Sequence, residues 1–419
     1  MPPLPPRAYL ARRVVTCDAA RATPSDSLGV IDSGAVLVEG GSIAWVGRQE
    51  EIPRGAALID LGDAVLTPGL VDAHTHACWV GSRHAEYAVR MAGGDYEAIA
   101  TAGGGIVATQ ASVAEATEDQ LVLALTARLR RMASLGVTTI EVKSGYGLLP
   151  EHERKQLRAI HRASGERGVP HVVPTFLALH ALPTSARADR EAYVSRVVTE
   201  LVPEIAAQKL ARFCDAYVDA NAFRIDEARA VGEAARAHGL GLRLHVGQFA
   251  DVGGAELCAE LGARSADHLE HVTDAALARL SASGTFAVLL PTACFTLAQS
   301  PPPIARMRAA NVRMVVASDA NPGTAPTESL PLALAMAVRL YGLTPEETIL
   351  GATRLAAASL DEPLRGVLAA GCSADLACWD LPHETAIVQP WGISRTRLVV
   401  RDGDVLYDAS CSERPYGRA

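Results

Sequence analysis

The sequence has few of the features that mark secreted, membrane or nucleic-acid-binding proteins. Its eight cysteines form no Cys-x-x-Cys pair, so no disulfide framework is indicated and free thiols are expected. No basic block occurs in a chain of net charge −8, which argues against nucleic acid and acidic membranes as partners. No apolar run approaches the roughly 18 residues needed to span a bilayer, and residues 1–6 (MPPLPP) do not resemble a signal peptide. We therefore expect a cytoplasmic protein.

Aromatic residues are also scarce, at 5% of the 419 residues. The core must therefore be built mainly from Ala, Val and Leu, because hydrophobic residues still make up 49% of the chain. A charged fraction of 21% is ordinary for a well-packed enzyme. The length fits two or three average domains, or one large barrel with an accessory domain.

Short strands are expected at both ends of the chain. Residues 34–38 (GAVLV) and 42–46 (SIAWV) flank residues 39–41 (EGG), a hairpin signal, and similar strands are indicated at 374–379 and 397–406. Hairpins do not fit a parallel barrel, whose strands need crossover helices. We therefore predict that both chain ends pair in one β-domain. The predicted division is 1–66 and 367–419 for this composite β-domain and 67–366 for a barrel between them.

Between these ends, strand-like apolar runs alternate with helical patterns, which is typical of βαβ units and a parallel sheet. One helix is predicted from Thr117, which can form a capping box with Gln120, through Ser134. Another begins at Thr344, with Glu347 in the corresponding place. The candidate strands of the parallel sheet include 172–173, 242–244, 286–290 and 313–317.

The most informative stretch is residues 67–76 (TPGLVDAHTH), where a short apolar strand ends in His-x-His. Residues two apart on a strand point to the same face, so His74 and His76 project together from one strand end. Two imidazoles placed in this way can reach a single metal ion. A bare His-x-His also occurs at solvated strand ends, so the surrounding sequence has to decide between the two interpretations.

Polar residues that can do chemistry follow several of the predicted strands. In a (β/α)8 barrel the C-terminal ends of all strands converge on one mouth, where active sites lie. Any one of these residues could be a satisfied polar group, but six strand ends that each carry one are hard to explain by structure alone. The sequence therefore predicts a polar site at the mouth of a barrel. The six positions are His74 with His76, residues 143–146, His180, His245, His268 and Asp319.

The stretch at 67–76 resembles the first-strand motif of the amidohydrolase superfamily, whose members are metal-dependent hydrolases. Longer strings are present at 141–148 (EVKSGYGL), 174–180 (PTFLALH), 265–269 (SADHL) and 318–323 (SDANPG), with a glycine-containing loop at 92–105. They narrow the resemblance to the imidazolonepropionase family, and the similarity extends over nearly the whole chain. The fold that the resemblance implies is α/β, a (β/α)8 TIM barrel with a small composite β-sandwich domain from both chain termini.

The resemblance implies one divalent metal ion per chain, zinc or iron. Both metals accept imidazole and carboxylate ligands, and a catalytic site leaves one position open for water. A bound ion would lower the pKa of such a water toward ~7, and a weakly bound carboxylate could take its proton and pass it on. The candidate metal ligands are His74, His76, His245 and Asp319, and the candidate catalytic residues are Asp319 and His268.

The activity implied is hydrolysis of the ring amide of 4-imidazolone-5-propanoate to N-formimidoyl-L-glutamate, a step of histidine degradation. The propionate of this substrate requires a cation, and the planar fork of Arg83 suits a carboxylate. Without the family match, Arg83 would be interpreted as a solvated surface residue. The positions that match substrate-binding residues of the family are Arg83, Tyr146, His180, Asn321, Gly323 and Thr324, and Gln248 is assigned to substrate binding as well.

Lys143 and Gln248 need separate interpretation. A carboxylated lysine bridges two metals in some amidohydrolases, but the string around Lys143 goes with a single metal in the resembling family. That family often has His-Ala-Asp-Glu where this chain has HVGQ at 245–248. Glutamine can hydrogen-bond but cannot act as a base, so proton transfer is assigned to Asp319 and His268.

Other functions compete with this prediction. Another cyclic amidohydrolase or an aromatic deaminase of the same superfamily would use the same ligands, and Arg83, Tyr146 and residues 321–323 favour an anionic imidazolone over both. A structural or binding relative without catalysis would be expected to lose metal ligands, and all four candidates are present. The expected partners are a small-molecule substrate and, by the resemblance, a second copy of the chain in a homodimer.

Overall fold

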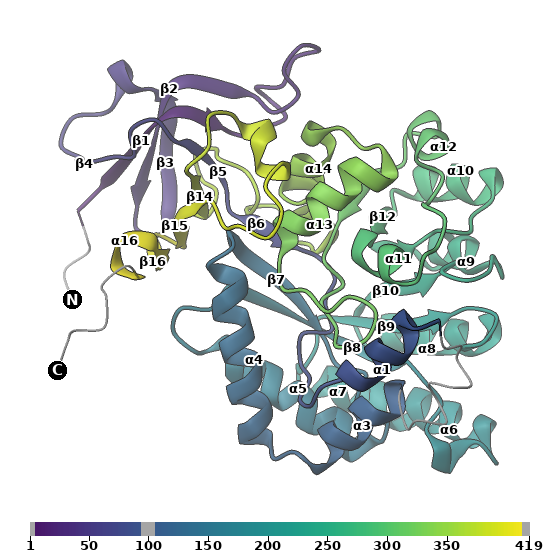
Figure 1. The fold of residues 1–419 in the computed structure, drawn as a ribbon. Coiled ribbons are helices and arrows are strands. Elements are labelled where there is room, and N and C mark those ends of the chain that lie inside the picture. The colour runs from purple at the N-terminus through teal and green to yellow at the C-terminus, as the bar shows by residue number, and fades with distance from the viewer. Residues whose placement is uncertain (1–4, 94–104, 413–419) are drawn as a thin grey trace.

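The structure, a computed structural model, describes residues 5–93 and 105–412; most of the glycine-containing loop predicted at 92–105 lies outside the described residues. Within these ranges the strands form two sheets of eight strands each. One sheet is built from both ends of the chain. The other is built from its middle, and most of the helices lie around it (Figure 1).

The first sheet joins the two ends of the chain, as the sequence predicts. Strand β5 (Val65–Pro68) pairs in parallel with β1 (Arg7–Val15) and antiparallel with β14 (Leu376–Trp379), so the purple and yellow strands of Figure 1 lie side by side. The predicted hairpin is formed by β2 (Val30–Glu39) and β3 (Ser42–Arg48). The other members are β4 (Ala57–Asp60), β15 (Thr396–Arg401) and β16 (Asp404–Asp408).

The second sheet is a parallel barrel in which each strand pairs with the next one along the chain. Its two edge strands are joined through the residues that follow them, by a parallel bridge between Thr75 and Ala320. This closure confirms the barrel that the sequence predicts. The strands are β6 (Leu70–Asp72), β7 (Val137–Lys143), β8 (His171–Leu179), β9 (Phe213–Val218), β10 (Gly241–Val246), β11 (Ser265–His268), β12 (Phe286–Leu289) and β13 (Met314–Val316).

Helices connect the barrel strands, and both predicted caps are present. Thr117 and Gln120 form a capping box at the start of α4 (Glu118–Ala133), and Thr344 and Glu347 form one at the start of α14 (Pro345–Gly351). The other helices that follow barrel strands include α1 (His84–Met91), α3 (Ile106–Glu115), α5 (Pro150–Ser164), α6 (Arg190–Arg196), α7 (Val202–Ala207), α8 (Ile225–Ala237), α9 (Gly254–Leu261), α10 (Asp274–Ser283), α11 (Pro291–Thr296), α12 (Ile304–Ala309), α13 (Leu330–Met336) and α15 (Arg354–Ser359), and a short α16 (Ala409–Ser412) lies near the C-terminus.

Trp379 lies where the first sheet meets the barrel. It belongs to β14, is 2% exposed, and donates through Nε1 to Oγ1 of Thr67 at 2.9 Å. Its ring lies against Gly136, between α4 and β7, where any Cβ would collide with the indole. Gly136 also has a φ of 96°, a conformation that favours glycine. Because position 136 has no side chain, the backbone can pass from α4 into β7 directly against the Trp379 ring of the first sheet.

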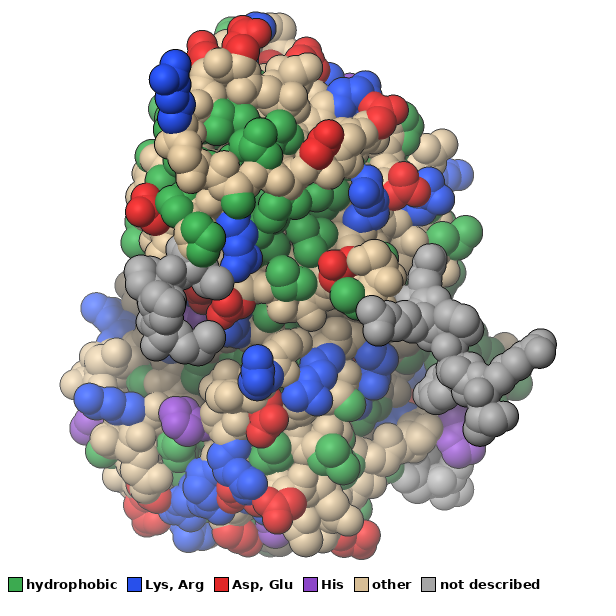
Figure 2. Space-filling view, turned by 90° about the vertical axis from the view of Figure 1, so that its left-hand side faces the viewer, with side chains coloured by type: hydrophobic (Ala, Val, Ile, Leu, Met, Phe, Trp, Pro, Cys, Tyr) green, Lys and Arg blue, Asp and Glu red, His purple; other side chains and the backbone are tan. Residues whose placement is uncertain are grey.

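At least one face of the molecule carries mixed charge. Acidic and basic side chains are interspersed on the face shown in Figure 2. Among the described residues, no helix combines the length and the apolarity needed to cross a bilayer.

Candidate active site

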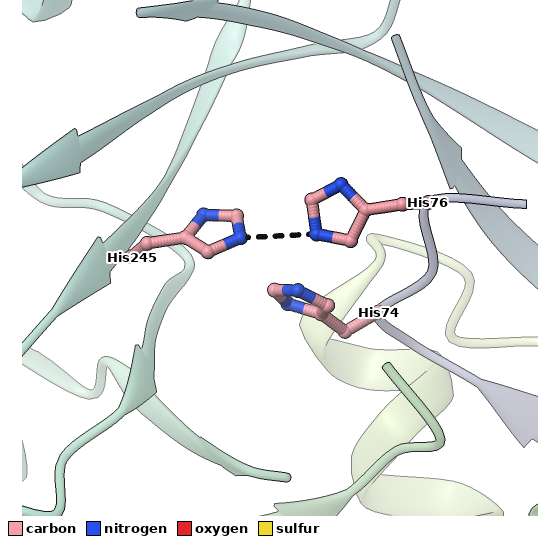
Figure 3. Close-up of side chains that lie close together, drawn as sticks. All are labelled: His74, His76 and His245. Atoms are coloured by element: carbon pink, nitrogen blue, oxygen red, sulfur yellow. Dashed lines mark hydrogen bonds between the residues drawn. The ribbon is translucent and has the colours of Figure 1, made fainter. Parts of the chain in front are cut away.

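Three histidines meet at the mouth of the barrel. His74 and His76 follow β6, and His245 lies near the end of β10. Nε2 of His245 lies 3.3 Å from Nε2 of His76, and one ring nitrogen from each of the three residues lies within 4.8 Å of the others (Figure 3). All three side chains are buried. The structure thus gathers three of the residues that the sequence singled out, here called the three-histidine cluster.

The ring nitrogens that His74 and His245 bring to this cluster carry lone pairs rather than protons. Nδ1 of His74 lies 2.6 Å from Oδ2 of Asp267, and Nδ1 of His245 lies 3.0 Å from Oδ2 of Asp215, so each Nδ1 donates its proton to a carboxylate. The Nε2 atoms are then unprotonated, and Nε2 of His74 has no hydrogen-bond partner among the described residues. Buried lone pairs that face one another are unfavourable without a cation between them. The donor set therefore fits a divalent metal ion.

Burial keeps the imidazoles of the cluster neutral. It lowers the pKa of His74, His76 and His245 well below 6.5, and the charge of Lys143 lowers the pKa of all three further. Neutral imidazole is the form that binds metals. The cluster can therefore accept a metal ion near neutral pH without first losing protons.

Asp319 brings a carboxylate to the three histidines. Its Oδ1 lies 3.4 Å from Nε2 of His74 and 3.5 Å from Nε2 of His76. The backbone N–H of Asp319 donates to the carbonyl of His74, and the neighbouring Ser318 donates through N and Oγ to the carboxylate of Asp72. Burial raises the pKa of Asp319 to about 7. Its carboxyl group can therefore exchange a proton near neutral pH.

His268 lies beside the cluster at the end of β11. Its ring centroid is 5.5 Å from that of His245 and 6.0 Å from that of His74. Burial opposes protonation of His268. The carboxylate of Glu270, whose Oε2 lies 3.7 Å from Nδ1 of His268, favours it more strongly, so the pKa of His268 is raised above 6.5. Its φ of 84° is a strained conformation for histidine that costs on the order of 1–3 kcal/mol, and such strain is often found at functional sites.

Tyr146 and His180 extend the site beyond His76. The rings of His180 and His76 stack with centroids 5.1 Å apart, and the Tyr146 ring lies 5.4 Å from that of His180. Nδ1 of His180 donates to the carbonyl of Gly145 at 2.8 Å, which leaves Nε2 as an acceptor. Burial lowers the pKa of His180 to about 4, so its ring is neutral. The two predicted substrate residues thus place a neutral acceptor and a hydroxyl next to the cluster.

Arg83 and Gly323 lie in contact, although they come from loops after β6 and β13. A Cβ on Gly323 would collide with Nη1 of Arg83. The other side of the guanidinium donates to Glu86, with Nε 2.7 Å from Oε2 and a second bond from Nη2 to Oε1. Glu86 also accepts from Arg90 and from the backbone N–H of Gly105. Arg83 is thus held in place, with its Nη1 side toward Gly323.

Asn321 organises the loop that carries Gly323 and Thr324. Its Oδ1 accepts from the backbone N–H of Gly323 at 2.9 Å and of Thr324 at 2.7 Å. Its Nδ2 donates to Oδ2 of Asp319 at 3.1 Å. Three of the predicted residues are therefore linked to Asp319 by hydrogen bonds, and the contacts of Asn321 are those of a positioning residue.

Gln248 is linked to the cluster through Tyr217. Its Oε1 accepts from the Tyr217 hydroxyl at 2.8 Å, and its carbonyl accepts from Nε2 of Gln299 at 2.7 Å. The Tyr217 ring lies 5.7 Å from that of His245. Because Tyr217 binds the oxygen of the amide, the NH2 group of Gln248 is the part that remains to meet a ligand.

Three buried carboxylates beside the cluster were missed by the sequence analysis: Glu141 in β7, Asp215 in β9 and Asp267 in β11. Nζ of Lys143 lies 2.9 Å from Oε1 of Glu141, 2.8 Å from Oδ2 of Asp215 and 3.8 Å from Oδ2 of Asp267. The available signal was an acidic residue inside an apolar strand, as in FCDAYV at 213–218. A charge in that position must have a partner, but the sequence does not say which.

The chain is similar to known proteins over most of its length. The model of the Amidohydrolase family matches residues 65–406. An imidazolonepropionase of Mesorhizobium japonicum is 42% identical over 386 residues, which cover 90% of this chain and 94% of the relative. An imidazolonepropionase of Caulobacter vibrioides is 42% identical over 392 residues, which cover 93% of this chain and 96% of the relative.

Solved structures share the fold at much lower sequence identity. A triazine hydrolase variant superposes with a TM-score of 0.73 at 17% identity, covering 96% of this chain and 95% of its own. A zinc complex of atrazine chlorohydrolase from Arthrobacter aurescens gives a TM-score of 0.68 at 18% identity, with the same coverage. The chain belongs to the Amidohydrolase family, and the family and the three-histidine cluster together indicate a divalent metal site. Within that class, the chain belongs to the imidazolonepropionase family.

Proposed function

We propose that this chain hydrolyses the ring amide of 4-imidazolone-5-propanoate and releases N-formimidoyl-L-glutamate. The observation that carries the proposal is the convergence of three neutral histidines and Asp319 at the barrel mouth. The 42% identity to imidazolonepropionases over most of the chain supports the choice of substrate.

We assign one divalent ion, Zn2+ or Fe2+, to His74, His76, His245 and Asp319. Both ions accept three imidazoles and a carboxylate. When bound, the ion supplies a Lewis acid that activates water and polarises the attacked carbonyl. A single ion is supported by Lys143, whose Nζ faces three carboxylates. A carboxylated lysine is itself an anion and would be repelled in that position.

Asp319 is assigned the proton transfers of the reaction. The oxygen of water adds to the ring carbonyl carbon, and Asp319 takes up the proton that is released. When the carbon–nitrogen bond breaks, Asp319 returns the proton to the leaving ring nitrogen. Without a bound ion, burial raises the pKa of Asp319 to about 7, and its carboxylate lies beside the histidines where it can accept and return a proton.

His268 is assigned to the carbonyl oxygen. Because Glu270 raises the pKa of His268, its ring can carry the second proton and donate a hydrogen bond. A donor placed where negative charge develops stabilises the transition state more than the bound substrate.

The propionate of the substrate is assigned to Arg83, on the Nη1 side that faces Gly323. Glu86 fixes the guanidinium from behind, so little side-chain freedom is lost on binding. Tyr146, His180 and the amide of Gln248 then surround the ring, and residues 321–324 form the wall beside Arg83. Recognition of the substrate's charge and of its ring thus comes from different loops of the barrel mouth.

Incubation of the Zn2+-loaded chain with imidazolone propionate tests the proposal. The expected result is loss of the substrate's ultraviolet absorbance with formation of formimidoylglutamate in equal amount. A cyclic amide without the propionate and an amino-substituted heterocycle serve as competing substrates, and both are expected to turn over more slowly. The assignment would be overturned if either compound were turned over faster than imidazolone propionate, or if imidazolone propionate were not turned over at all.

We further propose that the chain forms a homodimer in the cytosol and has no nucleic-acid partner. The family resemblance supports the dimer, and the net charge of −8, with charges of both signs interspersed on the face shown in Figure 2, supports the absence of nucleic acid. Light scattering on the purified chain tests the dimer, and a monomer mass at micromolar concentration would contradict it.

We also propose that residues 1–66 and 367–419 form one β-domain around the barrel of residues 67–366. The pairing of β5 with β14 supports this division. Limited proteolysis is expected to release both terminal segments together, whereas a stable fragment of residues 1–66 alone would contradict it.

A further inference from the structure

Lys143 ends β7 in the interior of the barrel and is fully buried, with a side-chain exposure of 0%. Lys143 takes no part in the proposed reaction. A buried ammonium group is costly unless it is paired and hydrogen-bonded. Lys143 is paired with three carboxylates at once, and two of them, Glu141 and Asp215, lie within 2.9 Å of its Nζ.

Each of the three carboxylates also holds part of the three-histidine cluster. Asp267 accepts from Nδ1 of His74 at 2.6 Å, and Asp215 accepts from Nδ1 of His245. These two contacts fix the tautomer and the rotation of each ring. Outer contacts of this kind set the direction of a metal-binding lone pair.

Glu141 holds the backbone at Thr75, between His74 and His76. Its Oε2 accepts from the N–H of Thr75 at 3.0 Å, and its carbonyl accepts from the Thr75 hydroxyl at 2.7 Å. The backbone N–H of Lys143 in turn donates to the carbonyl of Thr75 at 3.0 Å. Thr75 separates His74 from His76, so this clamp fixes the direction in which both side chains leave the chain.

We propose that Lys143 is a positioning residue for metal binding, whose ammonium group holds Glu141, Asp215 and Asp267 where they orient all three histidines. Without the cation, three carboxylates would share one buried region and repel one another. Arg243 provides a second positive charge, but it lies 3.9 Å from Asp267 and its bonds go to the carbonyls of Ala73 and Ser359. It is therefore not placed to replace Lys143 at the other two carboxylates.

The inference rests on the metal site of the proposed function but not on the substrate. The measurement is accordingly metal binding rather than turnover. Lys143→Met removes the charge and keeps a similar side-chain volume. Lys209→Met, the same change at an exposed position, is the matched control.

Zn2+ affinity is measured by competition with a chelator, and Co2+ is titrated while its visible absorption is recorded. Lys143→Met is expected to bind both ions 10- to 100-fold more weakly, the usual effect of losing an outer contact. The Co2+ absorption is expected to change as well, because the rings lose their fixed orientation, and Lys209→Met is expected to match the wild type. Wild-type affinity and spectrum in Lys143→Met would overturn the inference.

A second comparison applies where Lys143→Met does not fold. The double variant Lys143→Met/Asp215→Asn removes one charge of each sign, and it is compared with Asp215→Asn alone. Because Lys143 also holds Glu141 and Asp267, the double variant is expected to bind Co2+ at least tenfold more weakly than the single one. Equal affinities would overturn the inference.

The outcomes also separate this inference from the proposed function. A wild-type chain that bound neither Zn2+ nor Co2+ would overturn both. A chain that binds metal but does not turn over the substrate would leave this inference standing.

Discussion

The guanidinium of Arg83 occupies the space that a side chain at Gly323 would fill, because a Cβ there would collide with Nη1 and Cζ. The two residues lie in loops after β6 and β13, which meet because the barrel closes between these strands through Thr75 and Ala320. The absence of a side chain at position 323 therefore determines where the arginine can lie.

Gly323→Ala is expected to displace Arg83 and to weaken substrate binding. Charge-assisted hydrogen bonds contribute about 1.5–3 kcal/mol, so KM should rise by roughly 10-fold or more. The kcat value should change less, because the reacting groups are not moved. Steady-state kinetics with imidazolone propionate measure both constants.

Gly165→Ala is the matched control for this change. Gly165 ends α5 in an ordinary helical conformation, and a Cβ there meets only a carbonyl oxygen at 3.5 Å. This variant should retain both constants. A wild-type KM in Gly323→Ala would show that the substrate's carboxylate does not bind Arg83.

Asp319→Asn should lower kcat/KM by about 10²- to 10⁴-fold, because asparagine cannot take up or return a proton. Metal content has to be measured alongside, since Asp319 is also an assigned ligand. Gln248→Ala should lower kcat/KM much less, because the amide of Gln248 takes no part in proton transfer. Near-normal turnover in Asp319→Asn with none in Gln248→Ala would show that these roles are assigned the wrong way round.

The fold could be predicted from the sequence because its signals are local. The capping boxes at Thr117 and Thr344 and the glycine hairpin at 39–41 each depend on a few neighbouring residues. The pairing of the chain ends was predictable for a different reason: antiparallel hairpins have no place in a parallel barrel. The junction at Trp379 was not predictable, since it depends on a close approach to a distant glycine.

For the site, the sequence indicated the residues that stand at strand ends but not the residues that hold them. His74, His245 and Asp319 each follow or end an apolar run, and the barrel brings such positions to one mouth. Asp267 and Asp215 were missed because their importance comes from pairing across strands with a ring or an ammonium group. Such pairs are separated widely in the chain and have no local pattern.

Glu153→Ala should loosen the loop that carries Tyr146. The Glu153 carboxylate accepts from the backbone N–H of Gly145 at 3.0 Å and of Leu148 at 2.6 Å. Removing it leaves buried donors without a partner, at a cost of about 1–3 kcal/mol. The unfolding midpoint should fall and KM should rise, as measured by calorimetry and steady-state kinetics. Glu151→Ala, on the exposed side of the same helix, should change neither, and equal effects of the two variants would contradict this role.

His180 makes the stability of the metal-free chain depend on pH. Burial lowers its pKa from 6.5 to about 4 in the folded state. Above pH 6.5 both the folded and the unfolded chain carry a neutral ring, so the full contribution of His180 to stability is present. As the pH falls from 6.5 toward 4, the unfolded chain takes up a proton that the folded chain does not, and this contribution is lost.

The free energy of unfolding, measured by urea denaturation between pH 7 and 4.5, should therefore fall more steeply for the wild type than for His180→Gln. Glutamine cannot be protonated in this range, so the difference between the two chains isolates the titration of His180 from that of all other groups. His161→Gln, on the exposed side of α5, should keep the wild-type slope. Parallel curves for the wild type and His180→Gln would mean that the folded and unfolded chains protonate this ring equally, and would contradict the lowering of its pKa by burial.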